Sequence, residues 1–453
     1  MLIKNKDELL SHGNVKGRRI ALDILEYALE AVDSYKAVKK MVHIEEGNLI
    51  VGHLKFNLSK VGDIYVVGAG KATMPIGRAL EDVLGGKIRD GLVIVKRGQK
   101  RKLKRIRVIE AGHPIPDEAG MEGAKEMIKI AKSAREGDLV LSAITGGSSA
   151  LAPLPVEGIS LEDKKKVTEL LLKSGAVIQE INAVRKHISA IKGGKLAKHI
   201  HPAEIINLTV SDVIGDPLDY ITDLTVPDTS TFEDAVFALK KYGLWKKVSD
   251  SVRAHLKKGL ADPSLETPKD FAGMKVHTFI LSNNEAVCEV AKNRAEELGF
   301  NSLILSTMIE GESREAGIVL AGIAKEIEKN GRPLKPPSVL ISGGETTVTI
   351  QGECGEGGRN QEFVLGFSLK IDGSKNIVVA SVGTDGTDGP TDIAGGIADG
   401  YTLKRAKEKG IDVSKNLRGH NSSYVFRQLE DYIFTGPTGT NVMDLGVVVI
   451  TAS

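Results

Sequence analysis

The chain has 453 residues, of which 41% are hydrophobic and 26% are charged, so it is long enough for two or three globular domains. Its formal net charge of +2 argues against nucleic acid or an anionic membrane as the main partner. The N-terminal stretch lacks the apolar segment of a signal peptide, and no apolar run approaches the roughly 18 residues of a membrane span. We therefore expect a soluble, cytoplasmic protein.

The two cysteines, Cys288 and Cys354, are too few for a disulfide framework or a four-ligand zinc site. We expect both to be small residues of the core.

Strand-like and helix-like segments alternate along the chain. Residues 17–33 have helical apolar spacing and predict an entry helix. The first half then predicts strands at 63–70, 91–98, 138–144 and 203–213, with helices at 73–85 and 122–135. The second half predicts strands at 275–283, 302–309, 339–352, 376–389 and 447–453.

Two polar, proline-containing stretches, 257–270 and 330–338, are linker-like. In the first half, near-continuous apolar strands separated by amphipathic helices predict a parallel sheet that is covered on both faces. We expect two α/β domains, residues 1–265 and 266–453, with the active site in the cleft between them.

Glycine-rich loops follow most of the predicted strands, where ligands bind to parallel sheets. Such loops let backbone N–H groups approach an anion, and six of them predict a site for nucleotide phosphates, although a tight turn without a ligand explains any single loop. Three of the six loops are "GEGGRNQE", "GTDGTDGPTD" and "TGPTGTN", and the other three contain the residues listed next. The candidate phosphate-binding residues are Gly68, Gly70, Gly146, Gly147, Ser148, Ser149, Gly343, Gly344 and Glu345.

The first of these loops, "VVGAGKATMPIG", fits neither common nucleotide-binding motif. Thr73 stands where a dinucleotide fingerprint has its third glycine, and Tyr65 stands where a Walker A loop has its first. Lys71 follows this turn at the mouth of a predicted helix, where the helix dipole disfavours a cation. The lysine is therefore either exposed to solvent or placed to neutralise an anion.

Charged residues in the other loops add candidate chemistry. Arg359 offers a planar fork for carboxylate or phosphate oxygens, unless it is a surface arginine. Asp385 and Asp388 suit Mg²⁺, although turns capped by their own aspartate are the rival explanation. Asp212 is our candidate for the base that accepts the proton of a substrate hydroxyl, with Asp216, Asp219 and the aspartates of the 385–392 loop as alternatives.

The segment 181–202 carries several basic residues, and helical spacing places Arg185, Ser189 and Lys192 near one face. Arg185 on this face would suit a carboxylate substrate. A basic helix facing water is equally compatible with the spacing.

The chain resembles the class II glycerate kinases, the group with a C-terminal MOFRL domain. The resemblance covers nearly the whole chain from about residue 18 and rests on a specific set of motifs. They are "VVGAGKA", "GHPIPDEAG", "SLEDKKKVTELLLKSGA", "INAVRKHISAIKGGKLA", "VSDVIGDPLD", "ISGGETTV", "GGRNQE", "VGTDGTDGPTDIAGGIADG" and "TGPTGTN".

The resemblance implies phosphorylation of D-glycerate by ATP with Mg²⁺ to give 2-phosphoglycerate, with 3-phosphoglycerate as the alternative product. It implies a Rossmann-like N-terminal domain and a MOFRL region at about 338–450. Proposed active-site residues of the family match Lys71 and Arg359, and we add Asn360 of the same motif as a substrate-binding candidate. A homodimer is a reasonable expectation for such an enzyme.

The sequence departs from the family pattern at two places. Thr145 replaces the first of three glycines, and the loop at 220–228 is one residue shorter, which leaves its effect on substrate preference open. An NADPH-dependent hydroxypyruvate reductase is the rival enzyme, supported by the basic Lys96 and Arg97 after the second strand. A non-catalytic nucleotide-binding regulator is the other alternative.

Overall fold

The computed structural model of the protein describes residues 2–99 and 101–452 and divides into two compact α/β units. The first unit contains residues 34–211 and 216–281, and the second contains residues 2–33, 212–215 and 282–452. The predicted α/β fold class is confirmed. Within the described residues, no helix is long and apolar enough to cross a bilayer.

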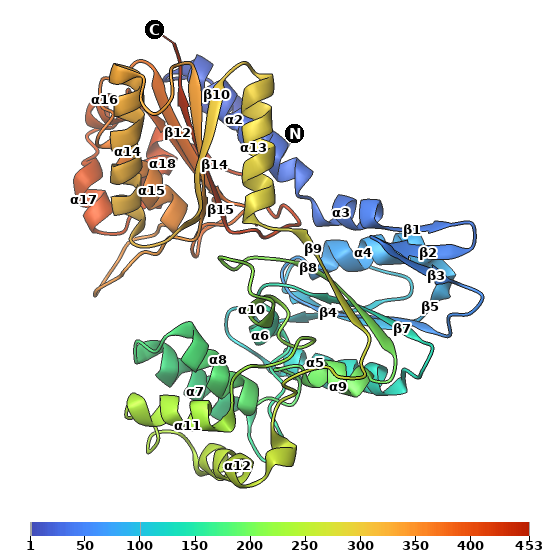
Figure 1. Ribbon diagram of the computed structural model, residues 1–453. Helices are drawn as coiled ribbons and strands as arrows, with labels where there is room; N and C mark the ends of the chain where they lie inside the picture. The colour runs from blue at the N-terminus through green and yellow to red at the C-terminus, as the bar shows by residue number, and fades with distance from the viewer. Residues whose placement is uncertain (1, 100, 453) are drawn as a thin grey trace. The chain divides into compact units, whose positions relative to one another are not determined.

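A six-stranded sheet forms the centre of the first unit, in the order β6-β5-β4-β7-β8-β9. Strands β4, β5, β6, β7 and β8 pair in parallel, and β4 and β7 are buried along their whole length because α4 covers one face of the sheet and α5 the other (Figure 1). The elements are β4 (Ile64–Ala69), α4 (Thr73–Leu84), β5 (Ile88–Lys96), β6 (Arg107–Ala111), α5 (Glu118–Ser133), β7 (Leu139–Ile144), α6 (Ser148–Leu151), α9 (Lys195–Ile200), β8 (Glu204–Val210) and β9 (Val276–Ser282).

The order of this sheet reverses beside β4, because the chain adds β5 and β6 on one side and β7 and β8 on the other. Such a switch point is the usual position of a ligand site in open α/β sheets. The loops after β4 and β7, which carry the first two glycine motifs, meet at this point.

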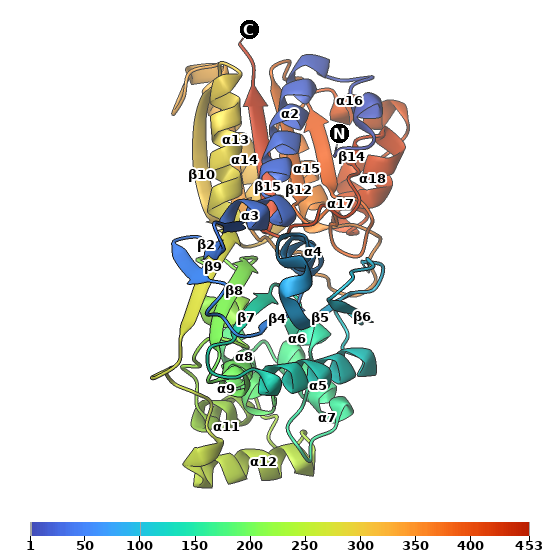
Figure 2. The same cartoon turned by 90° about the vertical axis from the view of Figure 1, so that its right-hand side faces the viewer.

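Two smaller groups complete the first unit (Figure 2). A three-stranded antiparallel sheet, which the sequence analysis did not predict, follows α3, and a group of helices has its own core around the buried Phe232. The elements are α3 (Ser34–Met41), β1 (Val42–Glu45), β2 (Asn48–Val51), β3 (Leu54–Asn57), α7 (Leu161–Lys173), α8 (Ile178–His187), α10 (Leu218–Ile221), α11 (Phe232–Lys241) and α12 (Asp250–Ala261).

The second unit has a mixed sheet in the order β10-β11-β15-β12-β13-β14. Strand β15 runs antiparallel to both β11 and β12, and β10 runs parallel to β11, so this sheet is mixed. Helices α2 and α13 lie on one face, and α14 and α15 lie on the other (Figures 1 and 2). The elements are α1 (Lys6–Leu9), α2 (Val15–Ala31), α13 (Asn284–Glu297), β10 (Asn301–Ile309), α14 (Ser313–Asn330), β11 (Ser338–Gly344), α15 (Arg359–Ser368), β12 (Ile377–Gly383), β13 (Gly395–Asp399), α16 (Thr402–Glu408), α17 (Val413–Arg418), α18 (Ser422–Leu429), β14 (Tyr432–Ile433) and β15 (Asp444–Ile450).

The compact units divide elsewhere than at the expected residue 265. Strand β9 is the edge strand of the first sheet, although its segment was expected to begin the second domain. The entry helix, now α2, packs on the second sheet, where the buried Arg18 contacts Asp399 and Asp431 at 2.6 Å each. Burial of these three charged groups together fixes the N-terminal segment on the second unit.

The two cysteines differ in their environments. Cys288 is buried in α13, and burial raises the pKa of its thiol to about 12. Cys354 is exposed, so the expectation of a core residue is wrong for this position.

Candidate active site

The first two glycine loops of the first unit are bonded to each other. The amide of Gly70 donates to a carbonyl of β5 at 3.2 Å, and that of Lys71 donates to the carbonyl of Gly146 at 2.8 Å. The amide of Ala72 donates to the side-chain oxygen of Thr145 at 3.2 Å. These donors already have partners inside the protein, so they do not form the expected phosphate cradle.

The glycines of the first turn allow this close packing. A Cβ on Gly68 would lie 2.8 Å from the carbonyl oxygen of Ala143. A Cβ on Gly70, which has φ of +148°, would overlap the side-chain oxygen of Thr145 and lie 2.7 Å from its carbonyl oxygen. We therefore correct the expected role of Gly68 and Gly70 from phosphate binding to packing.

Thr145 has a structural role in this junction. Its hydroxyl oxygen accepts a hydrogen bond from the amide of Ala72, the N-cap residue of α4. The threonine that replaces the family's glycine therefore satisfies one of the backbone donors that a helix start leaves unpaired. The buried hydroxyl of Thr73 donates to the carbonyl of Ala143 at 2.8 Å and fastens the same junction.

The second glycine loop, in contrast, keeps free donors. Within residues 2–99 and 101–452, the amides of Gly146, Gly147 and Ser149 donate no hydrogen bond, whereas that of Ser148 bonds the carbonyl of Thr145 at 3.2 Å. Gly147 has φ of +87°, the left-handed conformation that favours glycine. This loop can therefore present several N–H groups to an anion.

Lys71 and His113 flank the open loop. A Cβ on Gly147 would lie 3.3 Å from Cγ of Lys71 and 3.1 Å from Cδ2 and Nε2 of His113. The structure thus brings the predicted cation beside the predicted loop. The sequence analysis quoted the motif that contains His113 but assigned it no chemistry.

Buried lysines lie on α8 and in the turn after it. Nζ of Lys192 is 2.7 Å from Oδ2 of Asp223 and 2.6 Å from Oγ of Ser149. Nζ of Lys186 is 3.0 Å from Oδ1 of Asp228. The loop 220–228, which is shorter than in the family pattern, therefore supplies the counter-charges of this basic segment.

Arg185 on the same helix is partly buried and has no hydrogen-bond partner within the part of the chain that the structure describes. Burial lowers the pKa of its guanidinium, and the negative charge of Asp223 opposes that effect. Burial also lowers the pKa of Lys192, to about 8, and the negative charge of Asp223 opposes this shift as well. Excess positive charge close to the open loop favours an anionic ligand.

In the second unit, Arg359 binds two carboxylates at the start of α15. Its Nε and one terminal nitrogen contact Asp444 at 2.7 and 3.0 Å, and the other terminal nitrogen contacts Glu345 at 2.6 Å. Three of the five N–H groups of a guanidinium are thus engaged. Glu345 is therefore the ion-pair partner of Arg359, which corrects its expected role as a phosphate-binding residue.

Asp388 is a cap of helix α15. Its Oδ1 accepts the amide of Asn360 at 3.0 Å, and its Oδ2 accepts that of Gln361 at 2.9 Å, while the side-chain amides of both residues add a bond to each oxygen. Burial raises the pKa of this carboxyl, and the bonds from Gln361 and Asn360 lower it again. Both carboxylate oxygens are occupied, so the expected Mg²⁺ ligand is instead the N-terminal partner of a helix.

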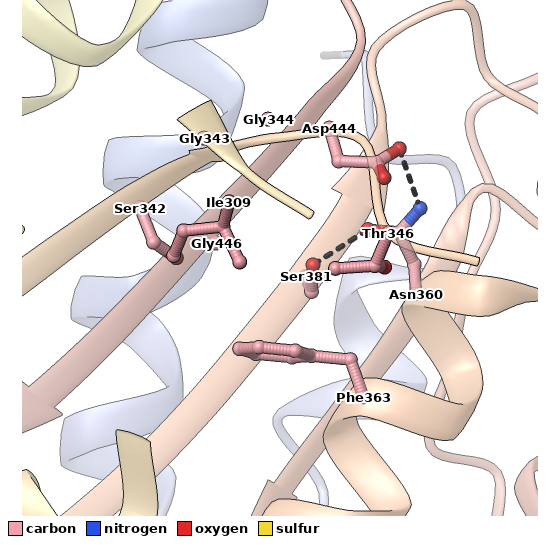
Figure 3. A pocket seen from close by; sticks show the side chains of 10 residues that line it. All are labelled: Ile309, Ser342, Gly343, Gly344, Thr346, Asn360, Phe363, Ser381, Asp444 and Gly446. Carbon is pink, nitrogen blue, oxygen red and sulfur yellow. Dashed lines mark hydrogen bonds between the residues drawn. The ribbon is translucent and has the colours of Figure 1, made fainter. Parts of the chain in front are cut away.

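Asn360 connects Asp388 with Asp444, and Figure 3 shows its side chain beside Asp444 and Ser381. Its Nδ2 also donates to Oδ1 of Asp444 at 2.8 Å, and its Oδ1 accepts the hydroxyl of Ser381 at 2.6 Å. The side chain is buried and positions Asp388 and Asp444, so it is a positioning residue and not the expected substrate contact. Burial raises the pKa of Asp444 to about 6, although Arg359 opposes the shift.

The third glycine loop lines a small cavity of about 20 Å³, which Figure 3 shows beside Ser342 and Asp444. A Cβ on Gly343 would lie 2.7 Å from Cγ of Asn284, and Gly344, with φ of +125°, packs on the backbone of Ile309. This volume suits about one water molecule. The expected phosphate-binding role of Gly343 and Gly344 is therefore corrected to strand packing.

The remaining acidic candidates differ from one another. Oδ1 of Asp385 accepts the amide of Thr387 at 3.0 Å, which is the turn that the sequence analysis gave as the rival to a metal site. Among the described residues, no group of three or more His, Cys, Asp or Glu side chains is arranged to hold a metal ion. Oδ2 of Asp212 accepts the side-chain amide of Asn441 at 2.7 Å.

Comparisons with known proteins agree with the motifs. Residues 20–257 match the domain of unknown function DUF4147, and residues 338–444 match the MOFRL family. "Glycerate 2-kinase" from Pyrococcus horikoshii is 48% identical over 436 residues, which cover 96% of this chain and 98% of that protein. The chain belongs to the class II glycerate kinase family.

Two further members extend the comparison. The crystal structure of a glycerate kinase from Thermotoga maritima has a TM-score of 0.83 and 40% identity, covering 96% of this chain and 99% of that one. A relative from Agrobacterium vitis, named "Putative hydroxypyruvate reductase", is 38% identical over 86% of this chain and 100% of that protein.

The sequence of this family member predicted the positions of the glycine-rich loops but not the ion-pair partners of the cations near them. It missed Asp223 and Asp444, the buried partners of Lys192 and Arg359. The available signal was an aspartate in or beside an apolar segment, because a carboxylate is seldom buried without a partner.

Proposed function

We propose that this chain is an ATP-dependent kinase that phosphorylates D-glycerate, with 2-phosphoglycerate as the product and 3-phosphoglycerate as the alternative. The names of the relatives from Pyrococcus horikoshii and Thermotoga maritima support this activity. The observation that carries the proposal is the loop at Gly146 and Gly147. Its two amides donate to no group among the described residues, and it lies against Lys71. We expect the reaction in the cytoplasm, and the homodimer stays a prediction.

In this proposal the protein supplies positioning and charge. The amides of Gly146 and Gly147 bind phosphate oxygens of ATP, and the ammonium of Lys71 neutralises the charge on the transferring group. Arg185, which lacks a hydrogen-bond partner among the described residues, binds the glycerate carboxylate. The two guanidinium N–H groups of Arg359 that have no partner among the described residues add a further contact to an anionic group.

The acceptor hydroxyl needs a base, and we keep Asp212 for this role. Its Oδ2 is held by Asn441 at 2.7 Å, which fixes one side of the carboxylate. A carboxylate that is oriented in this way can accept the hydroxyl proton as the phosphoryl group is transferred.

Mg²⁺ belongs to the proposal as the ion that accompanies the nucleotide phosphates. Proteins hold this ion through one or two carboxylates together with substrate phosphates. Asp388 does not fit as its ligand, because four hydrogen bonds occupy its two oxygens, and Asp385 already caps its own turn. We therefore assign no protein ligand of Mg²⁺.

A reductase that binds NADPH is less compatible with the first loop. A dinucleotide site of the Rossmann type binds the pyrophosphate through the amides of that loop. Those of Gly70, Lys71 and Ala72 are already bonded within the protein. Arg97, which was a candidate for a 2′-phosphate, contacts Asp117 at 2.5 Å.

The test is incubation of the protein with ATP, Mg²⁺ and D-glycerate, followed by phosphorus NMR. A 2-phosphoglycerate signal is expected, and a 3-phosphoglycerate signal would correct the position of transfer. Consumption of NADPH with hydroxypyruvate, without phosphoryl transfer, would favour the reductase. Binding of ATP without either reaction would favour a regulator.

Lys71→Ala tests the assignment within the kinase. We expect kcat to fall by at least about 100-fold, as for the loss of a group that stabilises transition-state charge, with little change in the unfolding midpoint. Lys87→Ala is the control, because this exposed lysine lies in the short 3-10 helix Gly85–Lys87, which follows α4. Near-normal turnover of Lys71→Ala would contradict the assignment.

A further inference from the structure

The buried ion pair of Lys192 and Asp223 continues to Ser149 in the second glycine loop. Lys192 lies in the turn after α8, Asp223 lies in the loop after α10, and Ser149 lies in α6 directly after β7. The side chain of Lys192 is 3% exposed, and its Nζ is 2.6 Å from Oγ of Ser149 and 2.7 Å from Oδ2 of Asp223. Three segments that are distant in the sequence thus meet at one ammonium group.

The chemistry of this contact fixes the direction of the Ser149 hydroxyl. An ammonium group has three donors and no acceptor, so Oγ of Ser149 must accept from Lys192. The hydroxyl proton is then free for another acceptor, and Ser149 donates to none within the described residues. Lys192 therefore leaves Ser149 as a hydrogen-bond donor.

This donor lies in the same loop as the amides of Gly146, Gly147 and Ser149, which have no partner in the part of the chain that the structure describes. Arg185, without a hydrogen-bond partner among the described residues, adds positive charge on the neighbouring helix α8. A group of donors beside unpaired positive charge is complementary to an anionic oxygen.

We propose that Lys192 is a positioning residue, which orients Ser149 so that its hydroxyl donates to an anionic group of a substrate. The proposal rests on the proposed kinase function. The anionic group is either the carboxylate of glycerate or a phosphate of the nucleotide, since both present the same acceptor oxygens.

A purely structural role for Lys192 makes different predictions. In that case its ammonium only holds Asp223 and the loop 220–228, and loss of the Ser149 hydroxyl has no effect on either substrate. If Lys192 acts through Ser149, removal of this hydroxyl impairs binding of one substrate while the ion pair stays in place.

The first experiment compares Ser149→Ala with Ser174→Ala, a control whose hydroxyl donates only to the carbonyl of Leu171. We expect Ser149→Ala to raise the KM of one substrate by about 10-fold, with kcat and the unfolding midpoint close to those of the unsubstituted protein. A raised KM for D-glycerate identifies the carboxylate, and a raised KM for ATP identifies a phosphate. Unchanged KM values for both would overturn the proposal.

The second experiment measures the pH dependence, which needs no change at Lys192. The charged groups that act on the ammonium of Lys192 are Asp223, Arg185 and Lys186. Lys164 is also close, because the charge of Lys192 helps to lower the pKa of Lys164. As pH rises through about 8, Lys192 loses its proton and can accept from Ser149, so the affected KM should rise by about 10-fold between pH 7 and 9.

Ser149→Ala should lack this rise, because it has no hydroxyl to redirect. An equal rise in Ser149→Ala would assign the titration to another group and overturn the proposal. If the unsubstituted protein phosphorylates no glycerate, the proposed function fails instead, and calorimetric binding of ATP to the protein and to Ser149→Ala then tests the donor by itself. Equal affinities in that measurement would also overturn the proposal.

Discussion

Replacement of Arg18 by Met should destabilise the second unit by about 3 kcal/mol. The guanidinium is fully buried and contacts Asp399 at 2.6 Å and Asp431 at 2.6 Å. Removal of one partner of a buried ion pair costs about 3–5 kcal/mol, because the other charge stays buried. We expect the lower end, since Asp431 keeps His12 at 2.7 Å and Arg405 at 2.8 Å.

Urea unfolding at pH 7, followed by circular dichroism, measures this loss. Arg19→Met is the matched control, because Arg19 is the exposed neighbour on the same helix, and its loss should cost under about 0.5 kcal/mol. Fluorescence of Trp245, the single tryptophan, follows the first unit separately. A cost for Arg18→Met within about 1 kcal/mol of that for Arg19→Met would refute the inference that this ion pair anchors the N-terminal segment.

Two further predictions concern the candidate site. Gly70→Ala should lower kcat/KM at least about 10-fold, because its Cβ would overlap Thr145 and displace Lys71. Gly85→Ala is the control and should change activity little, because Gly85 has φ of +51° and nothing lies within 4 Å of its Cβ. Steady-state kinetics of both variants measure the difference. Protonated Asp444 should stabilise the protein, because its pKa of about 6 in the folded state lies above its pKa in the unfolded chain. This contribution to the free energy of unfolding is present below about pH 4 and is lost as pH rises through 6. Relative to Asp444→Asn, the unfolding free energy should therefore gain about 2 kcal/mol between pH 7 and 4.5 in urea titrations, and an equal pH dependence of the two proteins would contradict the raised pKa.

The sequence predicted individual elements well where a period or an apolar run was clear. The strands at 63–70 and 138–144 and the helix at 73–85 are present as β4, β7 and α4. The pattern could not say which sheet a strand joins, because β9 has the same apolar character as a strand of either unit. Nor could it predict that β15, the last strand of the chain, inserts between β11 and β12 in the antiparallel direction, since that pairing is set by contacts distant in the sequence.

The site shows the same limit at the level of single residues. Lys71 and Arg359 were selected from the sequence as cations in glycine-rich loops, and their roles stay predictions, because charge alone does not reveal a partner. Arg359 is held by two carboxylates, and Asp388, which has the composition of a metal ligand, caps a helix. A carboxylate can serve either purpose, and only the donors around it decide between them.

Glycine at a strand end indicates that something approaches the backbone closely, but not what it is. At Gly70 the approaching group is Thr145, and at Gly344 it is the backbone of Ile309, so both are packing sites. At Gly147 the nearest groups are Lys71 and His113, and the amide of Gly147 has no partner within the described residues. A ligand-binding glycine loop is therefore distinguished by backbone amides that have no partner and lie beside a cationic side chain, and within residues 2–99 and 101–452 the loop at 145–149 meets both conditions, whereas those at Gly70 and Gly344 do not.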